Sequence, residues 1–276
     1  MENEYQLVVA DIDGTLVEKG AVLGEKSKDV IRRLREHGIY FGIASGRDVD
    51  IQVLHQYKVW GFDRNFEIVI GMNGSQLYDG IHQKRYDYYK LKTAWMKEII
   101  ELMEPYCENM YIYWHGKILA LREDDEVIAS AMRTQCDLVV AKDPSEMWQE
   151  ENAKIMVRVA EERMPEMEAY AAAHEGSGWI AFKTQPFLLE FTDRRVSKAV
   201  ALENFCRFNS IPLSRVMAFG DMSNDNEMLK AAGCGVCLKN GGDDTKACAD
   251  AITRLPVEQE GFADYIEQHI LLKHGW

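Results

Sequence analysis

The sequence has few cysteines and prolines, too little positive charge to balance its acids, and no long hydrophobic run. Six cysteines among 276 residues are too few for a disulfide-stabilised scaffold and are typical of a reducing compartment. No apolar stretch approaches the roughly 18–20 residues that cross a bilayer, and the short acidic N-terminal segment does not resemble a secretory signal. We therefore predict a cytoplasmic protein that does not enter a membrane.

Positive charge is scarce: the chain has 32 lysines and arginines but 45 aspartates and glutamates, which gives a net charge of −13. Proteins that bind nucleic acids usually carry a clustered basic face, and this sequence has no basic cluster. We therefore expect no nucleic-acid or anionic membrane partner, and nothing in the sequence requires a protein partner. A small anionic substrate remains possible, because one metal ion and one lysine can reverse the local potential.

The order of apolar segments predicts two modules. Apolar residues make up 47% and charged residues 28%, which is typical of globular proteins, and the length is about twice a typical domain of ~100–150 residues. Strand and helix patterns alternate over residues 5–80 and again from Ser197, with continuous apolar strands. Such strands favour a parallel sheet covered on both faces. We predict a discontinuous, Rossmann-like α/β core formed by residues 1–81 and 192–276.

Residues 82–191 have a different pattern and are predicted to form a separate α+β module inserted into the core. Strand pairs joined by tight turns, such as the turn at His115 and Gly116, indicate a mostly antiparallel sheet covered by helices on one face. In the core we expect a helix that ends near Lys58, and in the insertion a helix that begins near Pro144.

Four polar clusters lie near the ends of predicted core strands, where open α/β sheets place their ligand sites. The first contains Asp11 and Asp13, two carboxylates that suit one metal ion or one reacting group, but also an acidic turn that caps a helix. The second, Ser45–Arg47, offers a hydroxyl and backbone amides at a helix start. That arrangement suits either an anion or an ordinary helix cap.

The other two clusters lie in the C-terminal part of the chain. Lys198 is near the start of a predicted helix, where a cation opposes the helix dipole unless something anionic lies nearby. Asp221 and Asp225 bracket a turn that opens another helix, and a helix cap alone does not need two acids. Each cluster alone is ambiguous, but their order and their positions together favour one functional site.

These segments resemble the four motifs of the haloacid dehalogenase (HAD) superfamily of phosphohydrolases, and in particular its Cof-type branch. The matching positions are, in order, 11–16 (D-I-D-G-T-L), Ser45, Lys198 and 220–229. The insertion resembles the large cap domain that this branch carries between its second and third motifs. The resemblance therefore extends over the whole chain.

The resemblance implies a Mg²⁺-dependent phosphatase that works through an aspartyl-phosphate intermediate. Asp11 would be the nucleophile, and Asp13 would be the general acid and base. The expected metal ligands are Asp11, the backbone carbonyl of Asp13, Asp221 and Asp225. Contacts with the phosphate or the rest of the substrate are expected from Ser45, Gly46, Arg47, Lys198 and Asn224, with Asn73 as a further candidate.

The resemblance leaves the substrate open. We expect a small phosphorylated metabolite, either a sugar phosphate or a phosphorylated cofactor such as pyridoxal phosphate or flavin mononucleotide, with the cap domain recognising the leaving group. Candidate recognition residues in the insertion are aromatic or charged, namely Tyr111, Tyr113, Trp114, His115, Lys117, Arg122, Lys183 and Glu190. Each of them could equally be a packing residue or a solvated side chain.

Other interpretations of the same residues remain. The site could transfer phosphate to a sugar hydroxyl, as a phosphomutase or phosphotransferase does. A binding module that keeps the fold usually loses Asp11, Asp13 or Lys198, and this chain keeps all three. Cys234 and Cys237 could suggest a redox or zinc site, but their apolar surroundings favour buried structural thiols.

Overall fold

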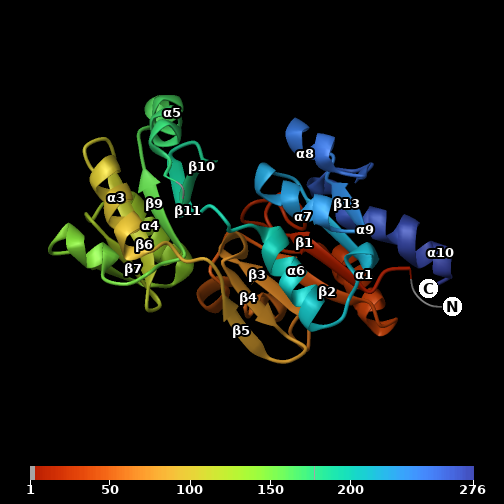
Figure 1. Cartoon of the computed structure of the whole chain (residues 1–276). Helices are drawn as coiled ribbons and strands as arrows, with labels where there is room; N and C mark the ends of the chain where they lie inside the picture. The colour runs from red at the N-terminus through yellow and green to blue at the C-terminus, as the bar shows by residue number, and fades with distance from the viewer. Residues whose placement is uncertain (1–3, 177) are drawn as a thin grey trace. The chain divides into compact units, whose positions relative to one another are not determined.

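The structure, a computed structural model, describes residues 4–176 and 178–276, and these form two compact units (Figure 1). The core unit consists of the chain up to Tyr88 together with Ser197–Trp276, and the inserted unit is Tyr89–Val196. Each unit has its own sheet and its own hydrophobic core, so the two are described in turn.

The unit boundaries lie seven and five residues later than the positions expected from the sequence, which were 81 and 191. The first boundary shifts because Lys84–Asp87 forms an edge strand of the core sheet. The second shifts because the last strand of the inserted sheet continues to Asp193.

The core unit is built on an eight-stranded sheet in the order β14-β13-β12-β1-β2-β3-β4-β5. Six consecutive strands run parallel to one another. They are β1 (Leu7–Asp11), β2 (Tyr40–Ala44), β3 (Ile68–Gly71), β12 (Val216–Gly220), β13 (Cys234–Cys237) and β14 (Ala251–Ile252). Two antiparallel strands, β4 (Gln76–Asp79) and β5 (Lys84–Asp87), extend the sheet. This mostly parallel sheet confirms the predicted α/β class.

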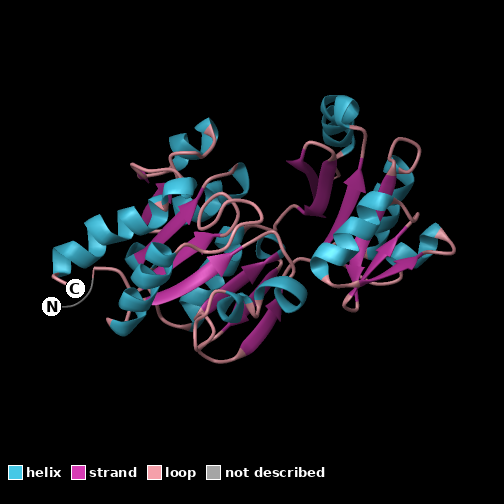
Figure 2. Cartoon of the chain, turned by 180° about the vertical axis from the view of Figure 1, so that it is seen from behind, coloured by secondary structure: helices cyan, strands magenta, loops and turns pink. Residues whose placement is uncertain are grey.

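Helices cover both faces of the core sheet (Figure 2). Successive residues of β1 point to opposite faces, so Val8 packs under one helical layer and Leu7 under the other. The first layer contains α1 (Glu25–Glu36) and α9 (Gly261–Ile266), which continues through a π-helical turn (Glu267–Leu271) into α10 (Leu272–His274). The second contains α6 (Lys198–Phe208) and α7 (Asn226–Ala231), and α8 (Asp243–Cys248) lies against α7.

The helix expected to end near Lys58 is broken into a π-helical turn (Val49–Val53) and the short α2 (Gln56–Val59). The segment is rich in β-branched residues, which have lower helix propensity. The prediction of one continuous helix is therefore wrong.

The inserted unit contains a six-stranded sheet in the order β10-β11-β9-β6-β7-β8. The strands are β6 (Asn109–Trp114), β7 (Lys117–Ala120), β8 (Asp137–Val140), β9 (Lys154–Arg158), β10 (Trp179–Gln185) and β11 (Leu188–Asp193). All neighbouring pairs are antiparallel except β7 and β8, which are parallel. This agrees with the mostly antiparallel sheet that the sequence predicts.

Helices α3 (Thr93–Met103) and α5 (Met164–His174) cover one face of the inserted sheet. The other face is partly covered by α4 (Asp125–Thr134), which packs on strands β6, β7, β9 and β11. The prediction that helices cover a single face is therefore corrected. The helix expected from Pro144 is only the short 3₁₀ turn Pro144–Trp148. Within the described residues, every helix is too short or too polar to cross a membrane.

Candidate active site

The four sequence clusters come together at the carboxyl ends of the parallel core strands. Asp11 ends β1, Ser45 follows β2 and Asp221 follows β12. These three strands are neighbours, and parallel strands place their carboxyl ends at the same edge of a sheet. The topology therefore brings together residues that lie far apart in the sequence.

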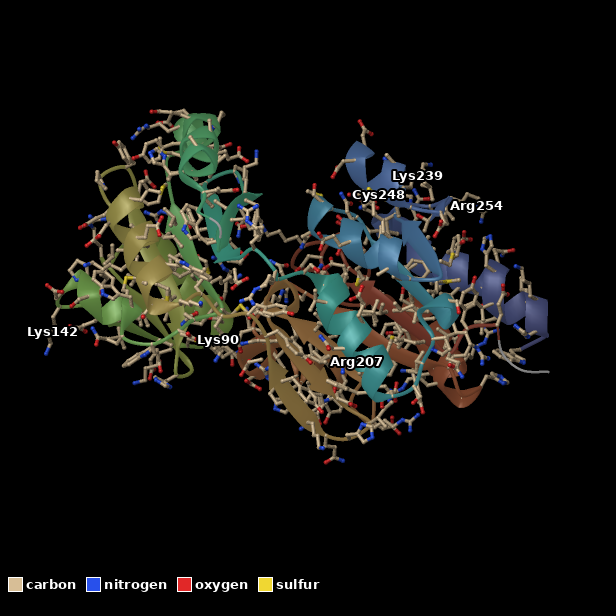
Figure 3. All side chains as sticks on the ribbon, viewed as in Figure 1. Lys90, Lys142, Arg207, Lys239, Cys248 and Arg254 are labelled. Carbon is tan, nitrogen blue, oxygen red and sulfur yellow. The ribbon has the colours of Figure 1, made fainter. Side chains whose placement is uncertain are left out.

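Lys198 joins this edge from the first position of α6 and is completely buried. Its Nζ donates to Asp11 Oδ1 at 2.5 Å and to Asp225 Oδ1 at 2.6 Å. Burial acts to lower the pKa of Lys198, but these two carboxylates outweigh it and raise the pKa above its usual value. Arg207, at the other end of the same helix, is exposed where a cation complements the dipole (Figure 3). The unfavourable position of Lys198 is thus explained by its anionic partners.

Asp225 is held in place by backbone amides as well as by Lys198. Its Oδ2 accepts hydrogen bonds from the N–H groups of Asp221 at 3.0 Å and Met222 at 3.2 Å. Gly220 precedes this turn, and a Cβ at that position would collide with the Asp225 side chain. The turn therefore fixes one Asp225 oxygen on the backbone and directs the other to Lys198.

Asp221 is positioned by the loop after β1. Its Oδ1 accepts a hydrogen bond from the Thr15 hydroxyl at 2.7 Å. Gly14 has a φ of +91°, and a Cβ there would collide with the Asp221 carboxylate. The sequence predicts no role for Thr15, although its place in the first motif is the available signal.

Asp11, Asp221 and Asp225 form a buried carboxylate cluster. One oxygen of each lies within 4.8 Å of the others. Burial, together with repulsion from Asp225 and Asp221, raises the pKa of Asp11 to about 8 against the opposing effect of Lys198. Burial and Asp225 likewise raise the pKa of Asp221 to about 6, although the Thr15 hydrogen bond opposes this. Three carboxylates beside one ammonium leave an excess of negative charge that a bound cation would offset.

This carboxylate cluster fits a hard divalent cation such as Mg²⁺, because its donors are all oxygens. Asp13, the fourth expected ligand, lies outside the cluster of side chains found among the described residues. The sequence predicts that Asp13 binds through its backbone carbonyl, and that part stays a prediction. The Asp13 side chain is directed elsewhere.

The Asp13 carboxylate forms a bidentate ion pair with Arg47. The Arg47 Nη2 lies 2.5 and 2.6 Å from the two carboxylate oxygens, and Nε donates to one of them at 3.1 Å. About a third of each side chain is exposed. The sequence predicted a substrate contact for Arg47 and did not predict this pairing with the expected acid and base.

The remaining predicted phosphate contacts lie in the same part of the core. Ser45 is buried, and its Oγ accepts the Arg47 N–H at 3.2 Å. Asn224 donates from Nδ2 to Asn73 Oδ1 at 3.1 Å. A Cβ built at Gly46 would lie 3.2 Å from that same oxygen, so Asn73 lies beside Gly46. The structure thus brings Asn224 and Asn73 next to the Ser45–Arg47 turn.

Most of the recognition candidates in the insertion have structural partners. Tyr111 packs under α4. Trp114 packs on the side of α3 and α5, and Lys183 pairs with Glu168 of α5. Three others interact near the surface: His115 with Glu150, Lys117 with Asp137, and Arg122 with the Glu108 carbonyl. Glu190 is buried and pairs with Lys154, and Tyr113 lies on the same strand face as Tyr111.

The two cysteines of the C-x-x-C segment lie on opposite faces of the core sheet. Cys234 packs into the layer of α1 and α9, whereas Cys237 packs into the layer of α6 and α7. Both thiols are free. They therefore cannot bind one metal ion or form a disulfide with each other, which supports their prediction as structural thiols.

Comparisons with known proteins agree with this architecture. A family model described as haloacid dehalogenase-like hydrolase matches residues 8–266. The Bacillus subtilis 5-amino-6-(5-phospho-D-ribitylamino)uracil phosphatase YitU is 25% identical over 288 residues, covering 99% of this chain and 100% of that protein.

Two solved structures share the fold over nearly the whole chain. TM0651 from Thermotoga maritima has a TM-score of 0.82 at 25% identity, covering 96% of this chain and 97% of its own. A haloacid dehalogenase-like hydrolase from Bacteroides thetaiotaomicron has a TM-score of 0.81 at 22% identity, covering 96% of this chain and 99% of its own. The likeness therefore includes both the core and the inserted unit.

Proposed function

The chain belongs to the haloacid dehalogenase-like hydrolase family and is a phosphatase, and we propose that it hydrolyses a small phosphorylated metabolite through an aspartyl-phosphate at Asp11. The observation that carries the proposal is the convergence of Lys198, Asp221 and Asp225 on that one carboxylate. The substrate would be a sugar phosphate or a phosphorylated cofactor, such as pyridoxal phosphate or flavin mononucleotide. The relative YitU, whose name describes a ribityl phosphate substrate, supports this class.

Asp11 and Asp13 divide the chemistry between them. A carboxylate oxygen of Asp11 attacks phosphorus, the ester P–O bond breaks, and Asp13 donates its proton to the departing alkoxide. Water then attacks the aspartyl-phosphate, Asp13 takes a proton from that water, and orthophosphate leaves as the Asp11 carboxylate is restored. Phosphate monoester hydrolysis is among the slowest uncatalysed reactions, and a covalent intermediate divides its barrier into two smaller steps.

Arg47 has a positioning role in this scheme. Its bidentate pairing holds the plane of the Asp13 carboxylate in one orientation before the substrate arrives, and one carboxylate oxygen must leave Arg47 before Asp13 carries the proton that it donates. A general acid must lie within hydrogen-bonding reach of the leaving oxygen, so a fixed orientation reduces the cost of reaching the transition state.

Charge neutralisation is the other requirement, because a carboxylate and a phosphate dianion repel each other. Lys198 supplies one positive charge next to Asp11. A Mg²⁺ ion held by Asp11, Asp221, Asp225 and the Asp13 carbonyl would supply the remainder and polarise the phosphoryl oxygens. Ser45, the Gly46 amide, Lys198 and Asn224 would bind the phosphoryl oxygens as charge shifts in the transition state.

We also propose that the inserted unit selects the leaving group, and that the protein acts in the cytoplasm without nucleic-acid, membrane or obligate protein partners. These statements rest on the resemblance and on the composition, with its net charge of −13.

The proposal is tested by measuring orthophosphate release from a panel of phosphorylated sugars and cofactors, with Mg²⁺ and with a chelator. We expect release that needs Mg²⁺ and that falls at least ~10³-fold in Asp11→Asn, because the nucleophile is lost. Asp29→Asn, which removes a carboxylate from an exposed ion pair on α1, is the matched control and should keep full activity.

Two results would contradict the proposal. Undiminished turnover in Asp11→Asn would exclude Asp11 as the nucleophile. An isomerised sugar phosphate without free orthophosphate would identify a phosphomutase instead, since water would then not be the acceptor.

A further inference from the structure

A buried polar cluster lies on the sheet of the inserted unit, on the face opposite α3 and α5. It consists of Lys154 on β9 with Glu190 and Thr192 on β11. Figure 1 labels these two neighbouring strands. Thr192 is directly opposite Lys154 in the strand register, and Glu190 lies two residues from Thr192 on the same face. The alternate residues Ile155 and Phe191 pack on the helical side.

Lys154 and Glu190 form a buried ion pair in this cluster. The Lys154 Nζ donates to Glu190 Oε1 at 2.9 Å and to Oε2 at 3.0 Å, and both side chains are at least nine-tenths buried. Removing two charges from water costs about as much as their attraction returns, so such a pair adds little net stability compared with apolar residues of similar size. Its presence on a strand face with many apolar residues is therefore poorly explained by folding alone.

Thr192 gives an independent indication of a ligand. Only 2% of the residue is exposed, and its hydroxyl has no hydrogen-bond partner within the described part of the chain. Leaving a buried hydroxyl unpaired destabilises a protein, and proteins usually satisfy such groups. Glu190 accepts its side-chain hydrogen bonds from Lys154 alone among the described residues. A carboxylate has about four acceptor positions, so it can accept further hydrogen bonds.

We propose that Lys154, Glu190 and Thr192 form the binding site of the inserted unit for the hydroxyl-bearing leaving group of the substrate, which narrows the proposed function and rests on it. A ligand hydroxyl donates to Glu190, and a neighbouring hydroxyl pairs with the Thr192 Oγ1. The charges of Lys154 and Glu190 cancel, so the site suits a neutral polyol or sugar rather than a second phosphate, which Glu190 would repel. A planar, mostly apolar leaving group would leave Thr192 unpaired.

Helix α4 limits where this ligand can lie on the sheet face. It packs on Tyr111, Met156 and Leu188, which share that face. On β10, Ile180 and Phe182 are the cross-strand neighbours of Thr192 and Glu190, and both are partly buried. The polar cluster is thus flanked by apolar side chains, as is typical of small-molecule sites that orient a ligand with few polar groups.

The test compares substrates with and without hydroxyls in the leaving group. The hydroxylated substrate is ribitol 5-phosphate, ribose 5-phosphate or glucose 6-phosphate, whichever the wild-type protein hydrolyses fastest. The substrate without hydroxyls is p-nitrophenyl phosphate, whose hydrolysis measures the core site alone. The variants are Thr192→Val, which keeps the shape of the side chain, and the double variant Lys154→Met/Glu190→Leu, which removes both charges. Thr192→Ser keeps the hydroxyl, and Lys183→Met changes a lysine that pairs with α5 on the other face.

We expect kcat/KM for the hydroxylated substrate to fall about 5–10-fold in Thr192→Val and about 10–100-fold in the double variant. Hydrolysis of p-nitrophenyl phosphate should stay within about 2-fold of wild type in both. Thr192→Ser should recover most of the loss, and Lys183→Met should lose nothing.

Two outcomes would overturn the inference while the proposed function stands. One is an equal loss on both substrates in variants that keep their circular dichroism spectrum, which would make the cluster structural. The other is no loss on the hydroxylated substrate in folded variants. A wild-type protein that hydrolyses no phosphate monoester would instead refute the proposed function, and the inference with it.

Discussion

Buried charge is arranged differently in the two units of the molecule. In the core, one ammonium faces three carboxylates at the ends of strands, so negative charge is in excess. In the insertion, one ammonium faces one carboxylate on the face of two strands, and the charges balance. Unbalanced charge attracts a cation and then an anionic phosphoryl group, whereas a balanced pair offers hydrogen bonds to a neutral ligand. The difference suggests that the core carries out the chemistry and that the insertion selects the substrate.

The largest expected effect comes from removing the core ammonium. Lys198→Met leaves Asp11 and Asp225 without their cation and should reduce hydrolysis of p-nitrophenyl phosphate at least ~10²–10³-fold. The free energy of unfolding in a chelator should fall by about 3–5 kcal/mol, because buried carboxylates lose their partner. Added Mg²⁺ should recover much of the stability but little of the activity. Steady-state kinetics and thermal unfolding measure the two effects.

Lys183→Met is the control for this change, because it removes a lysine that is about half exposed and should alter neither quantity. If Lys198→Met kept its activity, or unfolded no more easily in the chelator, the claim that the core site holds an excess of negative charge balanced by Lys198 would be wrong.

A smaller effect is expected from replacing Arg47. This change tests how the core positions its proton donor, a role that has no counterpart in the insertion. Arg47→Met frees the Asp13 carboxylate to rotate and should lower kcat about 10–100-fold with little change in KM. Arg33→Met, which breaks ion pairs with Asp29 and Glu267 away from the four sequence clusters, should leave both constants unchanged.

The split between kcat and KM distinguishes two roles for Arg47. A raised KM with an unchanged kcat would show that Arg47 binds the substrate directly, as the sequence predicts. The ion pair with Asp13 would then be only the resting arrangement of the side chain.

The core site could be predicted from the sequence because its geometry follows from topology. Asp11 ends a strand that the apolar pattern identifies, Ser45 and Asp221 directly follow two others, and parallel strands end at one edge. The pairing of Asp13 with Arg47 could not be predicted in this way. It depends on the rotamers of Asp13 and of the long Arg47 side chain in adjacent loops, which no spacing rule fixes.

The insertion was less predictable, because a residue on a strand face is functional or structural according to which face it occupies. Lys183 and Glu190 both looked like candidates, yet Lys183 points to α5 and Glu190 to the opposite face. A register change of one residue exchanges the two faces, and the sequence does not set that register clearly. Lys154 was missed because a lone lysine in the strand KIMVR gives no signal until its partner on β11 is known.

The smallest expected effect concerns the stability of the insertion and tests whether its buried pair serves folding at all. The double variant Lys154→Met/Glu190→Leu should change the free energy of unfolding by no more than about 1 kcal/mol, or raise it, because apolar side chains of similar volume replace two desolvated charges. Lys154→Met alone leaves Glu190 buried without a cation and should lower that free energy clearly. Urea unfolding of the full chain measures both variants against wild type. A double variant that is as unstable as the single one would show that the pair maintains the fold of the insertion. The buried pair would then serve folding, and the arrangement of charge would no longer support a reactive core and a substrate-selecting insertion.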